Sequence, residues 1–215
     1  MTAATTEVPV VIQETFSLEV RWIVSGPLDM AVAEWFDGFP SELESREDAY
    51  ILDPDLDRLS VKLRAGRALE MKAFHGSPGI LDLRGRARGR LQYWQKWSVP
   101  FHPPGRIGGD GDGWKRVRKQ RRISRFSVTP DRITAPAGDP AGPPRCAVEL
   151  TEIRVHDQDW WSVGLEATGP AELLRAGLQA TAALVFTRPL PDGVELRTEN
   201  SMSYAEWLRG PGHPW

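Results

Sequence analysis

The sequence predicts a single α+β domain that is mostly β and is built on an antiparallel sheet. Three observations predict it. The chain has 215 residues, which is enough for one large domain, and it shows no internal repeat or clear domain boundary. Polar and apolar side chains alternate along most of the chain, as they do in strands with one buried face. Helical patterns are few and short.

The first predicted strand covers residues 16–23 and shows the alternation most clearly. Ser17, Glu19 and Arg21 share one face, and apolar residues share the other. The same pattern predicts the remaining strands at residues 59–64, 69–74, 90–97, 115–128, 131–135, 145–155, 160–168 and 194–201.

Three helices are predicted. Pro27 suits the first turn of a helix over residues 28–36, and a second helix is expected over 168–183. Ser203 and Glu206 form a capping-box pattern that opens a short third helix. Loops rich in glycine and proline are expected at 75–89, 100–113 and 136–144.

The net charge of −2 conceals a strong internal asymmetry. Residues 1–60 hold 13 acids and 3 bases, residues 61–132 hold 18 bases and 5 acids, and residues 133–215 hold 11 acids and 6 bases. A basic centre in an acidic chain indicates a local anion site, and it argues against nucleic acid as the main partner. Charge alone fits solvated strand faces equally well.

Composition narrows the class of protein further. No apolar run approaches the roughly 20 residues of a membrane span, and no secretory signal is expected. The single cysteine, Cys146, predicts a reducing, cytoplasmic location. The four histidines lack the spacing of zinc ligands. The expected partner is a phosphorylated or otherwise anionic small molecule, without a membrane, and the sequence does not predict an oligomeric state.

Basic residues recur in pairs two positions apart, such as Lys62 with Arg64 and Lys119 with Arg121. Each pair lies on one face of its strand, so adjacent strands would present a surface of cations able to hold phosphate oxygens. Acids at alternating positions would supply the carboxylates that a divalent metal needs. These acids are Glu19, Glu70, Glu149 and Glu166. The alternative is a set of cross-strand ion pairs on a solvated face.

Eight short segments follow one another in a recognisable order. They are LEVR at 18–21, REDAY at 46–50, LSVKLR at 59–64, LEMK at 69–72, KQRR at 119–122, VEL at 148–150, GLE at 164–166 and SYAEWL at 203–208. In this order the chain resembles the CYTH family, the triphosphate tunnel metalloenzymes. The resemblance covers residues 14–208 as one tunnel domain and leaves 1–13 and 209–215 as expected flexible termini.

The resemblance implies a tunnel-like antiparallel barrel of eight strands with peripheral helices. It also implies a metal-dependent phosphohydrolase acting on tripolyphosphate, a nucleoside triphosphate or thiamine triphosphate. Glu19, Glu70, Glu149 and Glu166 would hold Mg²⁺ or Mn²⁺, and Lys62 or Lys72 would assist as acid or base if its pKa is depressed. The cations that would bind the phosphates are Arg21, Lys62, Arg64, Lys72, Arg90, Lys96, Lys119 and Arg121.

The chain departs from the family at two acidic positions. The Glu-x-Glu-x-Lys signature appears here as Ser17, Glu19 and Arg21, and the late Glu-x-Glu pair appears as Glu166 and Thr168. Loss of carboxylates lowers metal affinity while the cations remain. A non-catalytic or repurposed barrel that binds an anionic metabolite is therefore an alternative function, and an enzyme of small-molecule biosynthesis is a third. A helix-grip fold around an apolar cavity is the alternative fold.

Overall fold

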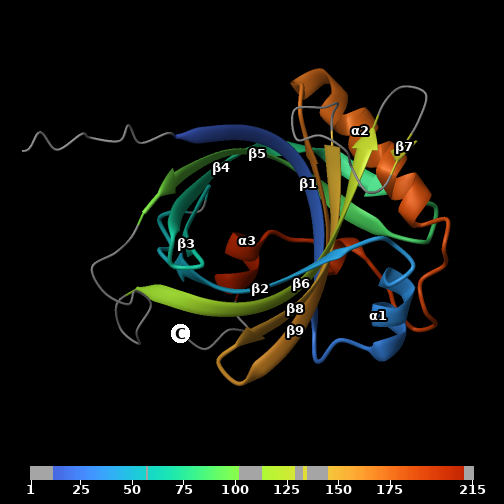
Figure 1. The fold of residues 1–215 in the computed structure, drawn as a ribbon, viewed down its shortest axis with the longest axis horizontal. Helices are drawn as coiled ribbons and strands as arrows, with labels where there is room; N and C mark the ends of the chain where they lie inside the picture. Colours follow the sequence, from blue (N-terminus) through green and yellow to red (C-terminus); the bar gives the residue numbers. More distant parts are fainter. Residues whose placement is uncertain (1–11, 57, 102–112, 129–132, 135–144, 211–215) are drawn as a thin grey trace, which may run out of the picture.

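The computed structural model describes residues 12–56, 58–101, 113–128, 133–134 and 145–210 (Figure 1). Its elements in chain order are β1 (Gln13–Ser25), α1 (Met30–Phe36), β2 (Glu42–Ile51), β3 (Leu59–Arg64), β4 (Ala68–Asp82), β5 (Arg88–Pro100), β6 (Trp114–Val128), β7 (Ile133–Thr134), β8 (Arg145–Val155), β9 (Gln158–Thr168), α2 (Ala171–Val185), the 3-10 helix η1 (Thr198–Asn200) and α3 (Tyr204–Leu208).

The strands close into an eight-stranded antiparallel barrel. Hydrogen bonds join them in the order β2-β3-β4-β5-β1-β9-β8-β6, and β6 also pairs with β2, which completes the ring. The two residues of β7 extend the sheet beside the end of β6. Closure satisfies both edges of every strand in the ring. The predicted barrel is confirmed, and the helix-grip alternative, whose sheet stays open, is wrong.

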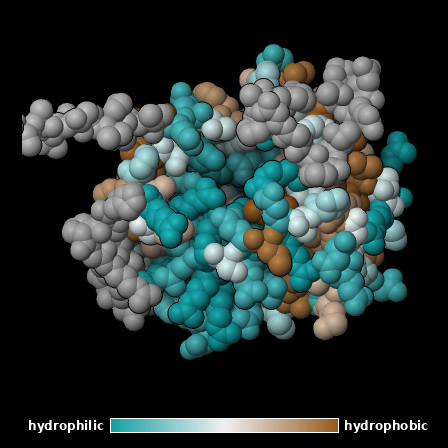
Figure 2. Space-filling view, viewed as in Figure 1, coloured by the Kyte–Doolittle hydropathy of each residue, from teal (hydrophilic) through white to brown (hydrophobic). Residues whose placement is uncertain are grey.

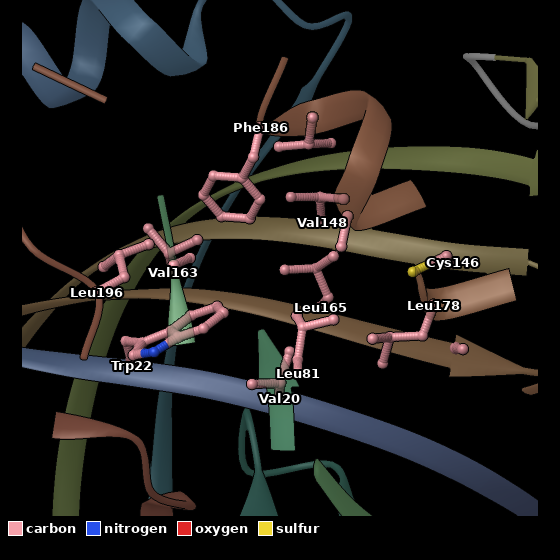
Figure 3. Close-up of a cluster of buried hydrophobic side chains, with 14 of the residues drawn as sticks. Val20, Trp22, Leu81, Cys146, Val148, Val163, Leu165, Leu178, Phe186 and Leu196 are labelled. Atoms are coloured by element: carbon pink, nitrogen blue, oxygen red, sulfur yellow. The ribbon is translucent and has the colours of Figure 1, made fainter. Parts of the chain in front are cut away.

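The main hydrophobic core lies outside the barrel, between the strands and the two longer helices. On β1, Leu18, Val20 and Trp22 are buried in this core with residues of α1 and α2. The indole Nε1 of Trp22 donates to the carbonyl of Arg88 at 2.9 Å, and its ring meets Phe186 edge to face. Figure 3 shows Val20 and Trp22 of β1 in one cluster with Leu178 of α2 and with Phe186, which follows that helix. Alternation then turns the polar face of β1 inward.

A second, smaller core closes one end of the barrel. Helix α3 lies inside the ring of strands (Figure 1), where Trp207 and Leu208 pack in one cluster with Ile23, Val117 and Ile153. Ser203 caps this helix by accepting from the backbone N–H of Glu206 at 3.2 Å, as its capping-box pattern predicted. The third helix is therefore an internal part of the barrel and not a peripheral one.

Three sequence predictions need correction. The first helix is capped by Asp29, whose carboxylate accepts from Ala31 N, so Pro27 precedes the helix instead of starting it. Much of the loop expected at 75–89 belongs to β4, where register shifts next to Gly76 and Gly79 allow glycine-rich sequence inside a strand. The strand expected at 194–201 contributes only two isolated bridges and the turn of η1.

Other predictions fall outside the described residues. They are the loop at 136–144, nearly all of the loop at 100–113, part of the strand at 131–135, and most of the termini expected to be flexible. Among the helices of the described residues, none has the length and apolar character that crossing a membrane requires.

The burial of α2 yields a stability prediction with a matched control. Leu178 is fully buried against the barrel, whereas Leu173 on the same helix is 41% exposed. We expect Leu178→Ala to lower the free energy of unfolding by about 3 kcal/mol, because it leaves a cavity, and Leu173→Ala to lower it by less than about 1 kcal/mol. Urea denaturation would measure both. Equal losses would contradict the placement of the core outside the barrel.

Candidate functional site

A polar cavity of about 90 Å³ lies in the lumen of the barrel. Hydrophilic side chains gather on the face that looks onto the ring, and hydrophobic ones lie mainly toward α1 and α2 (Figure 2). The charged residues lining the cavity are Glu19, Arg21, Arg46, Lys62, Glu70, Lys72, Lys119, Arg121, Glu149 and Glu166. Charge therefore faces the lumen, and the solvated-face alternative for these strands is wrong.

Asp48 on β2 is the most buried acid of the lumen. Its side chain is 0% exposed and pairs with Arg46 at 3.1 Å, Lys119 at 3.2 Å and Lys62 at 3.5 Å. Burial opposes its ionisation, but these three cations outweigh burial and hold the pKa of Asp48 well below its usual value. The carboxylate thus stays charged and fixes cations from three strands.

A second ion-pair group joins β3 and β4. Lys62 and Glu70 are cross-strand neighbours, and their side chains meet at 3.0 Å. Arg64 contacts the same carboxylate at 3.3 Å and also reaches Glu44 at 3.3 Å. Burial would raise the pKa of Glu70, but Lys62, Lys96 and Arg64 lower it to about 2.

On the opposite wall, two acids face each other across neighbouring strands. Glu19 of β1 and Glu166 of β9 are direct register partners, an arrangement that would repel without a cation between them. Lys72 supplies that cation from β4. Its ammonium lies 2.5 Å from Glu19 Oε1 and 3.7 Å from Glu166 Oε1.

Arg21 lies flat against the wall because the residue opposite it has no side chain. Gly164 is its register partner, and a Cβ there would lie 2.8 Å from the guanidinium carbon. Arg21 donates to Glu149 at 3.3 Å and to Ser162 at 3.1 Å, and it stacks over the Tyr204 ring at 4.8 Å. Glu149 also accepts from Arg121. The glycine therefore sets where this guanidinium rests.

The pKa values of Lys119 and Lys72 are shifted in opposite directions by the lumen. Burial lowers the pKa of Lys119, although Tyr50 and Asp48 favour its charged form. Its ammonium donates to the Tyr50 hydroxyl at 2.6 Å and lies 3.6 Å from the centre of the Tyr204 ring. Burial also opposes the charge of Lys72, but Glu166 and Glu19 outweigh it and raise the pKa. The condition set for Lys72 as a base, a depressed pKa, is therefore not met.

The structure brings most predicted phosphate ligands to one place. Arg21, Lys62, Lys72, Lys119 and Arg121 line the cavity. Lys96 on β5 is the register partner of Lys72, so it lies on the same face of the sheet as that lumen residue. Arg64 lines a second cavity at the barrel opening. Arg90 instead donates to the Ser201 carbonyl and pairs with Glu206 at 3.6 Å beside α3, outside the cavity lining.

None of the predicted site residues lies on β2, although the segment 46–50 is one of those that carry the family resemblance. Arg46 and Tyr50 line the cavity, and Asp48 organises its cations. Tyr204, from the segment assigned to a helix, lies beneath the two deepest cations. The alternation of Glu44, Arg46, Asp48 and Tyr50 was the available signal for the strand.

The predicted metal ligands do not converge as a set. In the described part of the chain, no three His, Cys, Asp or Glu side chains are grouped as a metal site. Glu70 is tied to Lys62 and Arg64, and Glu149 to Arg21 and Arg121. Glu19 and Glu166 share an ion-pair partner, Lys72. Two carboxylates suit a Mg²⁺ ion that brings phosphate oxygens and water as its other ligands.

The depressed pKa of Glu70 yields a prediction about acid stability. Its value is 4.5 when unperturbed and about 2 in the fold. Between these values the unfolded chain binds a proton at this carboxyl and the folded chain does not, so acid favours unfolding. We expect the free energy of unfolding to fall as pH drops from about 4.5 to about 2.

Denaturant titrations across this pH range would measure the effect. Glu70→Gln should flatten the pH dependence, and Glu152→Gln, on the outward face of β8, should leave it unchanged. An unaltered slope in Glu70→Gln would show that this carboxyl is not the coupled group.

No family model matches this chain, and no curated protein sequence matches it. Among solved structures, it is similar to the RNA triphosphatase Pct1 of S. pombe in complex with the Spt5 CTD, with a TM-score of 0.42, 10% identity and coverage of 84% of this chain and 82% of that chain. It is also similar to PH1819 of Pyrococcus horikoshii OT3, with a TM-score of 0.43, 14% identity and coverage of 88% and 97%. These likenesses are distant, so function has to be inferred from the lumen residues. By its own strand order and inward charge, the molecule is a closed, tunnel-like antiparallel barrel, the fold that the resemblance to the CYTH family implied.

Proposed function

We propose that this chain binds the triphosphate group of a small molecule in its lumen and hydrolyses it with a divalent cation that arrives with the phosphates. One observation carries the proposal. Cations from five different strands of a closed barrel, β1, β2, β3, β4 and β6, line a single cavity. Convergence of this kind suits a ligand whose negative charge is distributed along a chain.

The ion pairs of the lumen suggest how such a ligand would bind. Buried cations and carboxylates hold each other, so the lumen is stable without a ligand. A phosphate chain offers Lys62, Lys72 and Arg121 new charge-assisted hydrogen bonds in place of those to carboxylates. Carboxylates that lose Lys72 as a partner, Glu19 and Glu166, then become available to a cation that accompanies the phosphates.

Glu19 and Glu166 are the residues that would hold Mg²⁺ or Mn²⁺, which would supply charge neutralisation at the phosphoryl group and orientation of a water. The protein side chains supply the remainder. Arg21 and Arg121 bind and orient phosphate oxygens, because Glu149 holds both guanidinium groups and Gly164 leaves space for that of Arg21. Lys119 lies close to the Tyr50 hydroxyl and has a lowered pKa, which makes it a better candidate for proton transfer than Lys72.

Binding without catalysis is the second candidate, and a specific feature of the wall favours it. Ser17 and Thr168 are direct register partners, next to the pair formed by Glu19 and Glu166. They occupy the two positions where the family pattern has acids. Of these four neighbouring residues on the wall, only two carry a carboxylate. The smaller negative charge reduces the attraction for a divalent cation.

Turnover distinguishes the two candidates. We expect phosphate release from tripolyphosphate with Mg²⁺ or Mn²⁺, and we expect Lys62→Ala and Glu166→Ala to reduce it by at least about 100-fold because each removes a charge from the reacting centre. Arg154→Ala and Glu152→Ala, both on the outward face of β8, are matched controls that should keep full activity.

A colorimetric phosphate assay over a panel of triphosphates and metals would measure these rates. Absence of turnover across the panel, with binding retained, would favour the non-catalytic candidate. Equal rates in Lys62→Ala and the wild type would contradict a reaction in the lumen.

The order of binding is a separate prediction. Because two carboxylates and several cations face the same space, we expect tripolyphosphate to bind in EDTA and Mg²⁺ alone to bind weakly. Arg64→Ala should weaken anion binding by roughly 10-fold, because it removes a charge-assisted contact. Calorimetric titration would measure both affinities.

Adding acids to the wall tests whether the small number of carboxylates is the reason that Mg²⁺ alone binds weakly. Ser17→Glu with Thr168→Glu should raise the affinity for Mg²⁺, and if catalysis has been weakened by their loss, hydrolysis should rise as well. Tight binding of Mg²⁺ by the unmodified protein without any anion would contradict this order.

A further inference from the structure

The two longer helices lie on one side of the barrel only. Helix α2 packs against β1, β6, β8 and β9, and α1 lies on the same side of the ring (Figure 1). The hairpin formed by β3 and the first half of β4 lies across the ring from both helices, at the left of the same view. Neither α1 nor α2 therefore covers the outer surface of this hairpin.

The outward side chains of this region form apolar rows across neighbouring strands. Lys62 and Lys72 line the lumen, so the residues between the inward positions of their strands point outward. The register aligns Val61 of β3, Met71 of β4 and Trp97 of β5 in one row. Further rows lie on either side of it. We call this surface the outer apolar face, and it consists of the outward residues of 59–63, 69–73 and 97–99 together with Ile12 and Phe16.

Charge is confined to the rim of the outer apolar face. Every outward residue of the segments 59–63, 69–73 and 97–99 is apolar. At the edge, Gln95 donates to Glu14 at 2.5 Å and contacts His75 at 2.8 Å. The His75 ring lies 6.2 Å from the ring of Phe16. An apolar centre with a polar rim is the usual composition of a protein–protein interface.

The exposed area of this face matches what one partner contributes to a dimer. Met71 is 36% exposed, Leu59 37%, Phe16 48% and Ile12 60%. A fully exposed large side chain offers about 200 Å², so with their half-buried neighbours these residues offer on the order of 500 Å² of apolar surface. A stable interface takes about 800 Å² from each partner, and about 65% of it is apolar in homodimers. The requirement is therefore also about 500 Å².

We infer that the outer apolar face binds the same face of a second copy of this chain, with the central row of one copy over the central row of the other. A two-fold interface places a patch against itself, so a charge at its centre would oppose an identical charge. The centre of this face has no charge. Sheets that meet face to face bury such rows in one shared layer. The inference is independent of the proposed function, because these side chains point away from the lumen.

Sedimentation velocity of the full chain over a wide range of protein concentration would test the inference. We expect the wild type to sediment with twice the monomer mass. Met71→Asp should weaken association by at least about 100-fold, because it places two like charges opposite each other in the central row. Met30→Asp is the matched control, since Met30 is 75% exposed at the start of α1, on the other side of the barrel, and it should leave association unchanged.

Charge reversal distinguishes a second copy from any other partner. Met71→Lys should weaken association as much as Met71→Asp does. A mixture of the two variants should again form dimers, because opposite charges then meet across the central row. Thermal melting would verify that each variant folds, and recovery in the mixture cannot come from a misfolded chain.

Four results would overturn the inference. One is a wild type that stays monomeric at every concentration, and another is association that Met71→Asp leaves unchanged. A third is a mixture of the Asp and Lys variants that stays monomeric. The last is a full chain that dimerises only after residues 1–11 are deleted, which would assign the face to the N-terminal segment of the same chain.

Discussion

The pairing of charge inside a closed barrel is the constraint on which this structure depends. A charge removed from water is costly unless an opposite charge and hydrogen bonds replace the solvent. In the lumen, acidic and basic side chains alternate in space. Asp48 pairs with three cations, and Lys72 pairs with two glutamates on neighbouring strands. Each lumen residue therefore depends on a partner from another strand, and the pattern of charge along one strand is meaningful only with that of its neighbours.

This constraint also determines where the hydrophobic core lies. A strand has two faces, and once charges occupy the inner one the apolar residues must be covered from outside. Trp22 and Leu165 accordingly pack with α2 on the outer surface of the barrel. The same rule reverses at the end that α3 occupies. There Ile23 and Val117 face inward, so an apolar helix inside the lumen is their favourable neighbour.

The sequence allowed prediction of properties that belong to single strands. Alternation in β1 and β3 identified which side chains share a face, and the barrel confirmed it. Alternation does not show how deep in the barrel a side chain lies, or with which residue of another strand it pairs. Nothing in the spacing of Arg90 distinguishes it from Lys96, yet one pairs with Glu206 beside α3 and the other acts on lumen acids. Residues on both faces of β2 are nearly all charged, so the sequence does not indicate which face is buried. The ion pairs of Asp48 show which face points into the lumen. The glycines of β4 indicated a loop because a bulge and a turn use the same residue type.

The pairing of β1 with β9 explains how the residues of this wall fit together. Arg21 is opposite Gly164 on the neighbouring strand, and the missing side chain gives its guanidinium space against the wall. One step along the barrel, Glu19 and Glu166 remain as a pair, and one step further Ser17 and Thr168 oppose each other without charge. Acids are thus absent in a matched row rather than at unrelated places, and the hydroxyl of Ser17 donates to Glu19 at 2.6 Å. A single carboxylate in this row without a cation beside it would carry a high cost in free energy. The uncharged row therefore leaves Lys72 to pair with the one remaining couple of acids on this wall, and the charges of the lumen stay balanced.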